Sequence, residues 1–80
     1  MSRKIVVYSQ PGCMPCTKLK AFLSEGKMEY TDRNIAADGT ALAELEKLGY
    51  MTTPVIVIDG QAVAGFDRAK LENLLSDVPQ

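Results

Sequence analysis

The sequence predicts an α/β fold in which three helices flank a four-stranded mixed sheet, in the order β-α-β-α-β-β-α. Three observations support this prediction. Two short runs rich in β-branched residues, 5–7 and 55–58, have the composition of buried strands. Three other segments space their apolar residues as amphipathic helices do. An Asp-Gly pair after the second run predicts a hairpin.

The first strand and the first helix follow each other closely. We expect a strand over Arg3–Ser9, buried on both faces because three β-branched residues are consecutive. Residues 10–12 break it, and a helix is predicted over Thr17–Glu25, with Gly26 as its C-terminal stop. The residues at helical spacing are Cys16, Leu19, Phe22 and Leu23.

A second strand and a second helix come next. Met28–Ile35 alternates weakly, and its polar residues 32–34 indicate a strand that faces water on one side. Because a helix separates it from the first strand, we expect the two strands to be parallel. From Asp38 the pattern is helical again, and Gly49 lies just past the expected end. The apolar face of this helix is predicted to hold Leu42, Leu45 and Leu48.

The last third of the chain predicts a hairpin and a third helix. Val55–Ile58 and Gln61–Ala64 are joined by Asp59-Gly60, a pair that supplies the positive φ angles of a two-residue turn. Asp67 is placed to cap a helix that Pro79 ends. Its apolar stripe is Leu71, Leu74, Leu75 and Val78. Since no linker or repeat interrupts the series, we expect one domain over residues 1–80.

Composition excludes several classes of function. Nine Lys and Arg oppose ten Asp and Glu, and this balance without a basic run does not predict binding to nucleic acid or to an anionic membrane. No apolar stretch approaches the roughly 18 residues of a membrane helix, and no signal-peptide run begins the chain, so we expect a cytoplasmic protein. The absence of His excludes Cys-His and Ser-His-Asp catalysis.

The chemistry is concentrated at Cys13 and Cys16, the only cysteines of the chain. They lie where a buried strand runs into a helix, and unpaired amides at a helix N-terminus stabilise a thiolate. We therefore expect Cys13 to be the nucleophile and Cys16, one turn further, to be the resolving thiol. Pro15 is tolerated in a first helical turn but removes one amide donor, and Met14 is expected to be exposed.

Other interpretations of the cysteine pair stay open beside thiol exchange. A structural disulfide is disfavoured because so short a loop removes little entropy from the unfolded chain. A zinc site would need ligands from a second subunit, since the chain has no His and no further Cys. A glutathione-assisted iron–sulfur cluster shared by two chains is the alternative from another class.

Thr53-Pro54 is the second informative pair. Pro54 directly precedes the expected strand 55–58, where no ladder donor is needed. If the bond is cis, the backbone of Thr53 stays available to pair with an incoming peptide or thiol tripeptide. Gly65 is expected in a turn with positive φ.

Several side chains near these motifs have two interpretations. Lys18 and Lys20 follow the cysteines and could attract substrates, but exposed helix charges usually serve solvation. An apolar rim around Cys13 could be formed by Tyr8, Tyr50, Met14 and Phe66. Alternatively, Tyr8 and Phe66 belong to the core.

The motifs together resemble those of the glutaredoxin and thioredoxin family over nearly the whole chain. The matching stretches are Tyr8-Ser9-Gln10-Pro11-Gly12-Cys13-Met14-Pro15-Cys16, Thr53-Pro54-Val55 and Gly65-Phe66-Asp67. The resemblance implies a thioredoxin fold, catalytic Cys13 and Cys16, and a cis Pro54 beside them. It further implies substrate contacts by Met14, Pro15, Thr53, Pro54, Gly65, Phe66 and Asp67.

The implied activity is that of a dithiol-disulfide oxidoreductase that reduces protein disulfides or glutathione mixed disulfides without a tightly bound cofactor or metal, acting as a monomer. Two reductants stay open, glutathione as co-substrate and thioredoxin reductase. Glutaredoxins carry a Lys where Gln10 stands, and Cys-Met-Pro-Cys is more similar to the thioredoxin motif. These departures make a thioredoxin-reductase-coupled redoxin, like those that donate electrons to ribonucleotide reductase, a serious alternative to a glutathione-coupled one.

Overall fold

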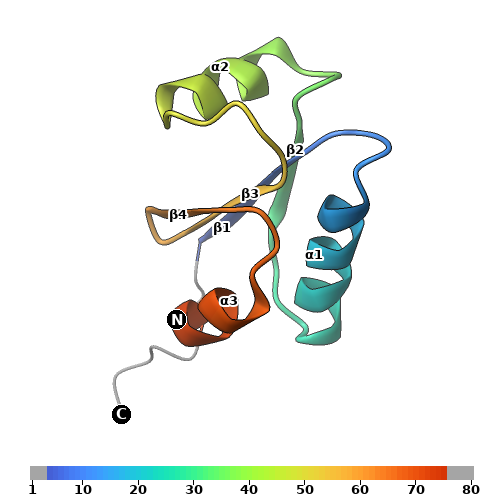
Figure 1. Cartoon of the computed structure of the whole chain (residues 1–80), viewed down its shortest axis with the longest axis vertical. Coiled ribbons are helices and arrows are strands. Elements are labelled where there is room, and N and C mark those ends of the chain that lie inside the picture. Colours follow the sequence, from blue (N-terminus) through green and yellow to red (C-terminus); the bar gives the residue numbers. More distant parts are fainter. Residues whose placement is uncertain (1–3, 76–80) are drawn as a thin grey trace.

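The structure, a computed structural model, describes residues 4–75. Its elements are β1 (Ile5–Ser9), α1 (Met14–Glu25), β2 (Thr31–Asn34), α2 (Gly39–Lys47), β3 (Val55–Ile58), β4 (Gln61–Ala64) and α3 (Arg68–Leu75). The strand order is β2-β1-β3-β4, with β1 parallel to β2 and antiparallel to β3, and β3 antiparallel to β4. Figure 1 shows this arrangement, which confirms the predicted mixed sheet with three helices.

Both faces of the sheet are covered, as the first strand predicts. Side chains alternate along β1, so that Ile5 and Val7 pack toward α1 and α3, whereas Val6 and Tyr8 pack toward α2. The larger core cluster contains Ile5, Val7, Leu19, Leu23, Ile56, Ile58, Val63 and Leu71. The smaller one, on the α2 face, contains Tyr8, Ala41, Leu45 and Val55. In Figure 1, α2 accordingly lies apart from α1 and α3.

Helix α1 begins earlier than the predicted Thr17. Cys13 is its N-cap, with extended backbone angles, and Met14 is the first helical residue. The first turn has no apolar periodicity that would mark it as helical, and Pro15 is accommodated there, as expected for a residue whose missing amide has no helical acceptor. The helix ends at Glu25 with Gly26 as its C-cap, as predicted.

Strand β2 is shorter than the predicted Met28–Ile35. Lys27 has a positive φ of 56°, and the amide of Met28 donates to the carbonyl of Leu23 at 3.0 Å. These residues complete the C-terminal turn of α1, so their backbone is not available to the sheet. The first strand also begins later than predicted, at Ile5, because Lys4 is not part of the strand; the predicted start at Arg3 lies outside the described residues.

The buried face of helix α2 contains the predicted Leu45 but not the predicted Leu42 and Leu48. Ala41 and Leu45, one turn apart, are fully buried, whereas Leu42 and Leu48 are 36% and 42% exposed. The prediction followed the spacing of the leucines, but a small Ala lets the helix lie close to the strands. The predicted cap is confirmed, since Asp38 accepts from the amide of Thr40 at 2.9 Å.

The hairpin has the predicted bounds for both of its strands. Asp59 and Gly60 have φ angles of 49° and 88°, as the Asp-Gly pair requires. The cap of α3 is confirmed as well, because the Asp67 carboxylate accepts from the amide of Lys70 at 3.1 Å. Leu71 is fully buried. The predicted positions Val78 and Pro79 lie outside the described residues.

A polar network also attaches α2 to the sheet. The Tyr8 hydroxyl donates to Glu44 at 3.1 Å, and Arg33 Nη2 contacts the other oxygen of Glu44 at 3.0 Å. Burial raises the pKa of Tyr8, and the hydrogen bond to Glu44 and its charge act in the same direction against a smaller opposing effect of Arg33. The Tyr8 hydroxyl is therefore held protonated as a donor.

Replacing Tyr8 by Phe should lower the free energy of unfolding by about 1 to 2 kcal/mol, because it removes a hydrogen bond to a charged acceptor while preserving the ring. Urea denaturation measures the loss. Tyr30→Phe is the matched control, since the Tyr30 hydroxyl has no hydrogen bond within residues 4–75, and it should cost less than about 0.5 kcal/mol. Equal losses in the two variants would contradict the assigned role of the network.

Candidate active site

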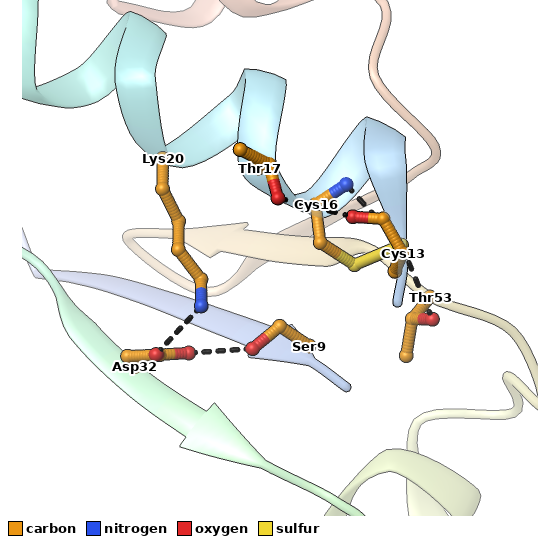
Figure 2. Close-up of a disulfide and its surroundings, with 7 residues drawn as sticks. All are labelled: Ser9, Cys13, Cys16, Thr17, Lys20, Asp32 and Thr53. Carbon is orange, nitrogen blue, oxygen red and sulfur yellow. Dashed lines mark hydrogen bonds and ion pairs between the residues drawn. A yellow bond between two sulfur atoms is a disulfide. The ribbon is translucent and has the colours of Figure 1, made fainter. Parts of the chain in front are cut away.

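The two cysteines form a disulfide at the start of α1, with their Cα atoms 5.2 Å apart. Strand β1 and the loop after it bring Cys13 to the end of the sheet, and Cys16 lies in the first helical turn (Figure 2). The two sulfurs differ in accessibility, because Cys13 is half-buried whereas Cys16 is only 2% exposed. An incoming reactant therefore has access to the Cys13 side of the bond.

Hydrogen-bond donors converge on the Cys13 sulfur. The amide of Cys16 lies 3.2 Å from Cys13 Sγ, and the hydroxyl of Thr53 lies 3.7 Å from the same atom. Pro15, between the cysteines, offers no amide. Donors at a helix N-terminus stabilise a thiolate, so the charge of the reduced pair is favoured on Cys13.

The predicted cis bond between Thr53 and Pro54 is present. Pro54 is buried, and its carbonyl accepts from the amide of Gly65 at 2.7 Å. Gly65 has the predicted positive φ, at 77°. The structure thus brings Cys13, Thr53, Pro54 and Gly65 together from three separate loops.

The other predicted site residues have varied environments. Met14 is 68% exposed next to Cys13. Phe66 packs against the larger core cluster and meets Phe22 edge to face at 6.0 Å, and Asp67 caps α3. Tyr8 is buried beneath α2, as the core interpretation requires. Substrate contact by Phe66 and Asp67 stays a prediction.

One polar cluster beside the disulfide was not predicted. Ser9, which is 1% exposed, donates to Asp32 Oδ1 at 2.7 Å, and Lys20 Nζ lies 2.8 Å from Asp32 Oδ2 (Figure 2). Lys20 is one helical turn after Cys16, so the cluster fastens the sheet to the first part of α1. Lys20 therefore has a partner, whereas the sequence suggested simple solvation. The contact depends on the register of β1 and β2, which no local motif reveals.

The stability contributed by Asp32 should depend on pH. Burial opposes ionisation, but the hydrogen bonds from Lys20 and Ser9 and the Lys20 charge outweigh it, so the pKa of Asp32 lies below its usual range. A lowered folded-state pKa gives stability that is present above the unfolded pKa of about 4 and is lost as the pH falls through the folded value. Since Asp32 is partly exposed, Asp32→Asn should cost at most about 1 kcal/mol at pH 6.

Urea denaturation at pH 6, 4 and 3 checks this expectation. The difference in free energy of unfolding between the unsubstituted chain and Asp32→Asn should become smaller as the pH falls. Lys20→Met removes one of the two donors to Asp32. The pH dependence of its free energy of unfolding should lie between that of the unsubstituted chain and that of Asp32→Asn. A difference that stays constant down to pH 3 would show that ionisation of Asp32 does not contribute.

Within residues 4–75, no group of three or more Cys, Asp or Glu side chains is arranged to hold a metal ion. None of the helices in the same range combines the length and apolar composition needed to cross a bilayer.

Comparison with known proteins gives the family. The family model for glutaredoxin matches residues 5–63, which include the disulfide, the cis proline and most of the hairpin. The chain belongs to the glutaredoxin family. A glutaredoxin-like 8.6 kDa protein from a rubredoxin operon of Clostridium pasteurianum is 35% identical over 72 residues, covering 89% of this chain and 96% of that one. The glutaredoxin-like protein NrdH of Lactococcus lactis is 31% identical over 70 residues, covering 88% and 97%.

Solved structures agree with the fold. The crystal structure of the thioredoxin-like protein BC3987 superposes with a TM-score of 0.84 at 40% identity, covering 89% of this glutaredoxin-family chain and 99% of that protein. The NrdH-redoxin of Escherichia coli superposes with a TM-score of 0.81 at 22% identity, which shows the shared fold.

As a glutaredoxin-like redoxin with a Cys-x-x-C pair, this chain is a thiol-disulfide oxidoreductase. Redoxins of this family act on disulfide substrates and are restored by a reductant, and they generally work without a tightly bound cofactor.

Proposed function

We propose that the chain reduces protein disulfides by a two-cysteine mechanism in which Cys13 attacks and Cys16 resolves, and that a thioredoxin-reductase-type flavoprotein restores it. The observation that carries the mechanism is the difference between the two sulfurs. Cys13 is accessible and receives the amide of Cys16 and the hydroxyl of Thr53, whereas Cys16 is nearly fully buried.

The reaction begins with the reduced chain. The Cys13 thiolate attacks one sulfur of the substrate disulfide, forming a mixed disulfide and releasing a substrate thiolate that takes up a proton. Cys16 then loses its proton and attacks Cys13 Sγ. The second substrate thiol leaves, and the Cys13–Cys16 disulfide forms. Two electrons have passed to the substrate, and the reductase returns them through its own dithiol.

The substrate binds where the site loops meet. Within residues 4–75, the amide and carbonyl of Thr53 have no backbone partner, which supports pairing with an extended peptide beside Cys13. Met14 and Pro15 directly follow Cys13 in the chain, Pro54 directly follows Thr53, and the amide of Gly65 donates to the Pro54 carbonyl. Phe66 and Asp67 contribute by holding the loop after the hairpin against α1 and α3.

The charges near the site support thioredoxin reductase over glutathione. Glutathione carries two carboxylates and one ammonium group, so its recognition benefits from cations. Gln10 is exposed and neutral, and residues 10–17 and 50–54 contain no charged side chain. The similarity to a protein named thioredoxin-like, at 40% identity, agrees with this preference.

The test compares two ways of reducing the oxidised chain. NADPH with thioredoxin reductase is expected to support turnover of insulin at least about tenfold faster than glutathione with glutathione reductase, which corresponds to about 1.4 kcal/mol of preference. Gln10→Lys is the informative variant, because it adds a cation beside the site. It should raise the turnover rate with glutathione and so reduce the difference between the two reductants. Faster turnover with glutathione in the unsubstituted chain would contradict the proposed reductant.

A further inference from the structure

The ring of Phe22 on α1 is contacted by two residues from the start of α3 and the segment before it. Phe66 meets the ring edge to face, with centroids 6.0 Å apart and an interplanar angle of 62°. The guanidinium carbon of Arg68 lies 5.6 Å from the centroid of the same ring. Both contacts are favourable, because an aromatic ring has a positive edge and a negative face. We call Phe22, Phe66 and Arg68 together the Phe22 cluster, and Figure 1 shows the segment between β4 and α3 passing beside α1.

The Phe22 cluster is directly connected to the loop that contains the cis proline. Gly65 precedes Phe66, and its amide donates to the carbonyl of Pro54 at 2.7 Å. In the described part of the chain, this is the one backbone hydrogen bond made by residues 51–54. The position of Pro54 therefore depends on where the Phe22 cluster holds the residue after Gly65.

The same loop leads back to the reactive sulfur. Thr53 precedes the cis bond, and its hydroxyl lies 3.7 Å from Cys13 Sγ (Figure 2). Cys13 is the N-cap of α1, the helix that also contains Phe22, so the contacts close into a ring. Phe22 comes nine residues after Cys13, about 13 Å along a helix, which is too far for contact with a substrate sulfur bonded to Cys13. Any effect of Phe22 on the reaction must therefore pass through other residues.

We propose that Phe22 and Arg68 are positioning residues for the thiol attack. Through the segment after β4 and the cis proline, they fix the Thr53 hydroxyl at Cys13 Sγ. The inference rests on the proposed function, in which Cys13 is the nucleophile, and adds two residues that do not touch the reacting atoms. A hydroxyl that is already fixed stabilises the thiolate without a further loss of conformational entropy. Loosening the Phe22 cluster should therefore slow the attack although every reacting group is retained.

Single-turnover kinetics of the pre-reduced chain with bis(2-hydroxyethyl) disulfide measure the attack without a reductase. Phe22→Leu keeps an apolar side chain but removes both ring contacts, and it should slow the attack about three- to tenfold. Phe22→Tyr keeps the ring and should react within about twofold of the unsubstituted chain. Tyr30→Leu is the matched control, because Tyr30 is partly buried against the same core cluster and has no aromatic or cation contact within residues 4–75. It should also stay within about twofold.

A double-mutant cycle with Thr53 distinguishes positioning from a general loss of structure. Thr53→Val removes the hydroxyl and keeps the shape of the side chain. Because the Phe22 cluster acts through this hydroxyl, adding Phe22→Leu to Thr53→Val should slow the attack less than about twofold further. A purely structural defect would slow the attack by the same factor whether or not the hydroxyl is present.

Arg68 gives a second, milder test, because this residue is exposed and its replacement leaves the core intact. Arg68→Met should slow the attack about two- to fivefold, and Arg68→Lys, which keeps a cation, should recover at least about half of the lost rate. Glu72→Gln removes the ion pair with Arg68 at 2.9 Å but leaves the cation over the ring, so it should have no effect. Lys70→Met removes the same charge from another exposed position on α3 and should have no effect either.

Three results would overturn the inference: equal rates of Phe22→Leu and Tyr30→Leu, equal slowing by Phe22→Leu with and without the Thr53 hydroxyl, or equal rates of Arg68→Met and Lys70→Met. Urea denaturation verifies that each variant is folded, and the Arg68 comparison alone decides the outcome should Phe22→Leu fail to fold. Failure of the unsubstituted chain to reduce bis(2-hydroxyethyl) disulfide would instead overturn the proposed function, so the two failures are distinguishable.

Discussion

Replacing Cys13 by Ser is expected to lower disulfide reduction at least about 10³-fold, because it removes the nucleophile that begins the reaction. Cys16→Ser should behave differently. Its Cys13 can still attack, but the mixed disulfide has no internal thiol to resolve it, so a covalent complex with the substrate should accumulate. Insulin reduction measures the first effect, and mass spectrometry under non-reducing conditions detects the second.

The two variants are controls for each other, since both remove the disulfide and only one keeps the accessible sulfur. Far-UV circular dichroism should show that both remain folded, because the pair closes a loop too short to contribute much stability. Trapping by Cys13→Ser but not by Cys16→Ser would reverse the assigned roles.

Replacing Leu19 by Ala should lower the free energy of unfolding by about 2 to 5 kcal/mol, as expected for a fully buried leucine. A chain of 80 residues has a total stability of about 4 to 12 kcal/mol, so this loss is a large share. Leu19 lies on the buried face of α1, one turn after the resolving cysteine. Urea denaturation should therefore show a much lower midpoint.

Leu42→Ala is the matched control, because the same change is made at a leucine that is 36% exposed. It should cost less than about 1 kcal/mol. Comparable losses at the two positions would show that the face of α2 bearing Leu42 contributes to the core more than its exposure indicates.

Local chemistry predicted the parts of the fold that depend on a few adjacent residues. Asp59-Gly60 predicted the hairpin because few other pairs adopt two positive φ angles at low cost. Strand β2 was predicted too long because residues 26–28 complete the turn after α1. On α2, Leu45 was predicted to be buried but Ala41 was missed, because Ala41 is weakly apolar and its burial depends on how closely the helix approaches the sheet.

The site likewise has features that depend on adjacent residues and features that depend on how distant elements pack. The strand–cysteine–helix junction is continuous in sequence, so the position of the cysteine pair between β1 and α1 was predictable, although the helix begins three residues earlier than predicted. The cluster of Ser9, Lys20 and Asp32 joins three separate elements, and its geometry follows from strand register and helix placement. A single sequence contains no signal for such a contact.

The central position of β1 also has a consequence for biosynthesis. Ile5 pairs with Ile58, so the middle of the sheet cannot close until residues near 58 have left the ribosome. Until then the nascent chain can form at most the local unit of β1, α1 and β2, with the backbone edge of β1 that pairs with β3 left without its partner strand. The resolving thiol is thus surrounded by its full core only late in translation, and oxidants encountered earlier would meet two thiols of more similar reactivity.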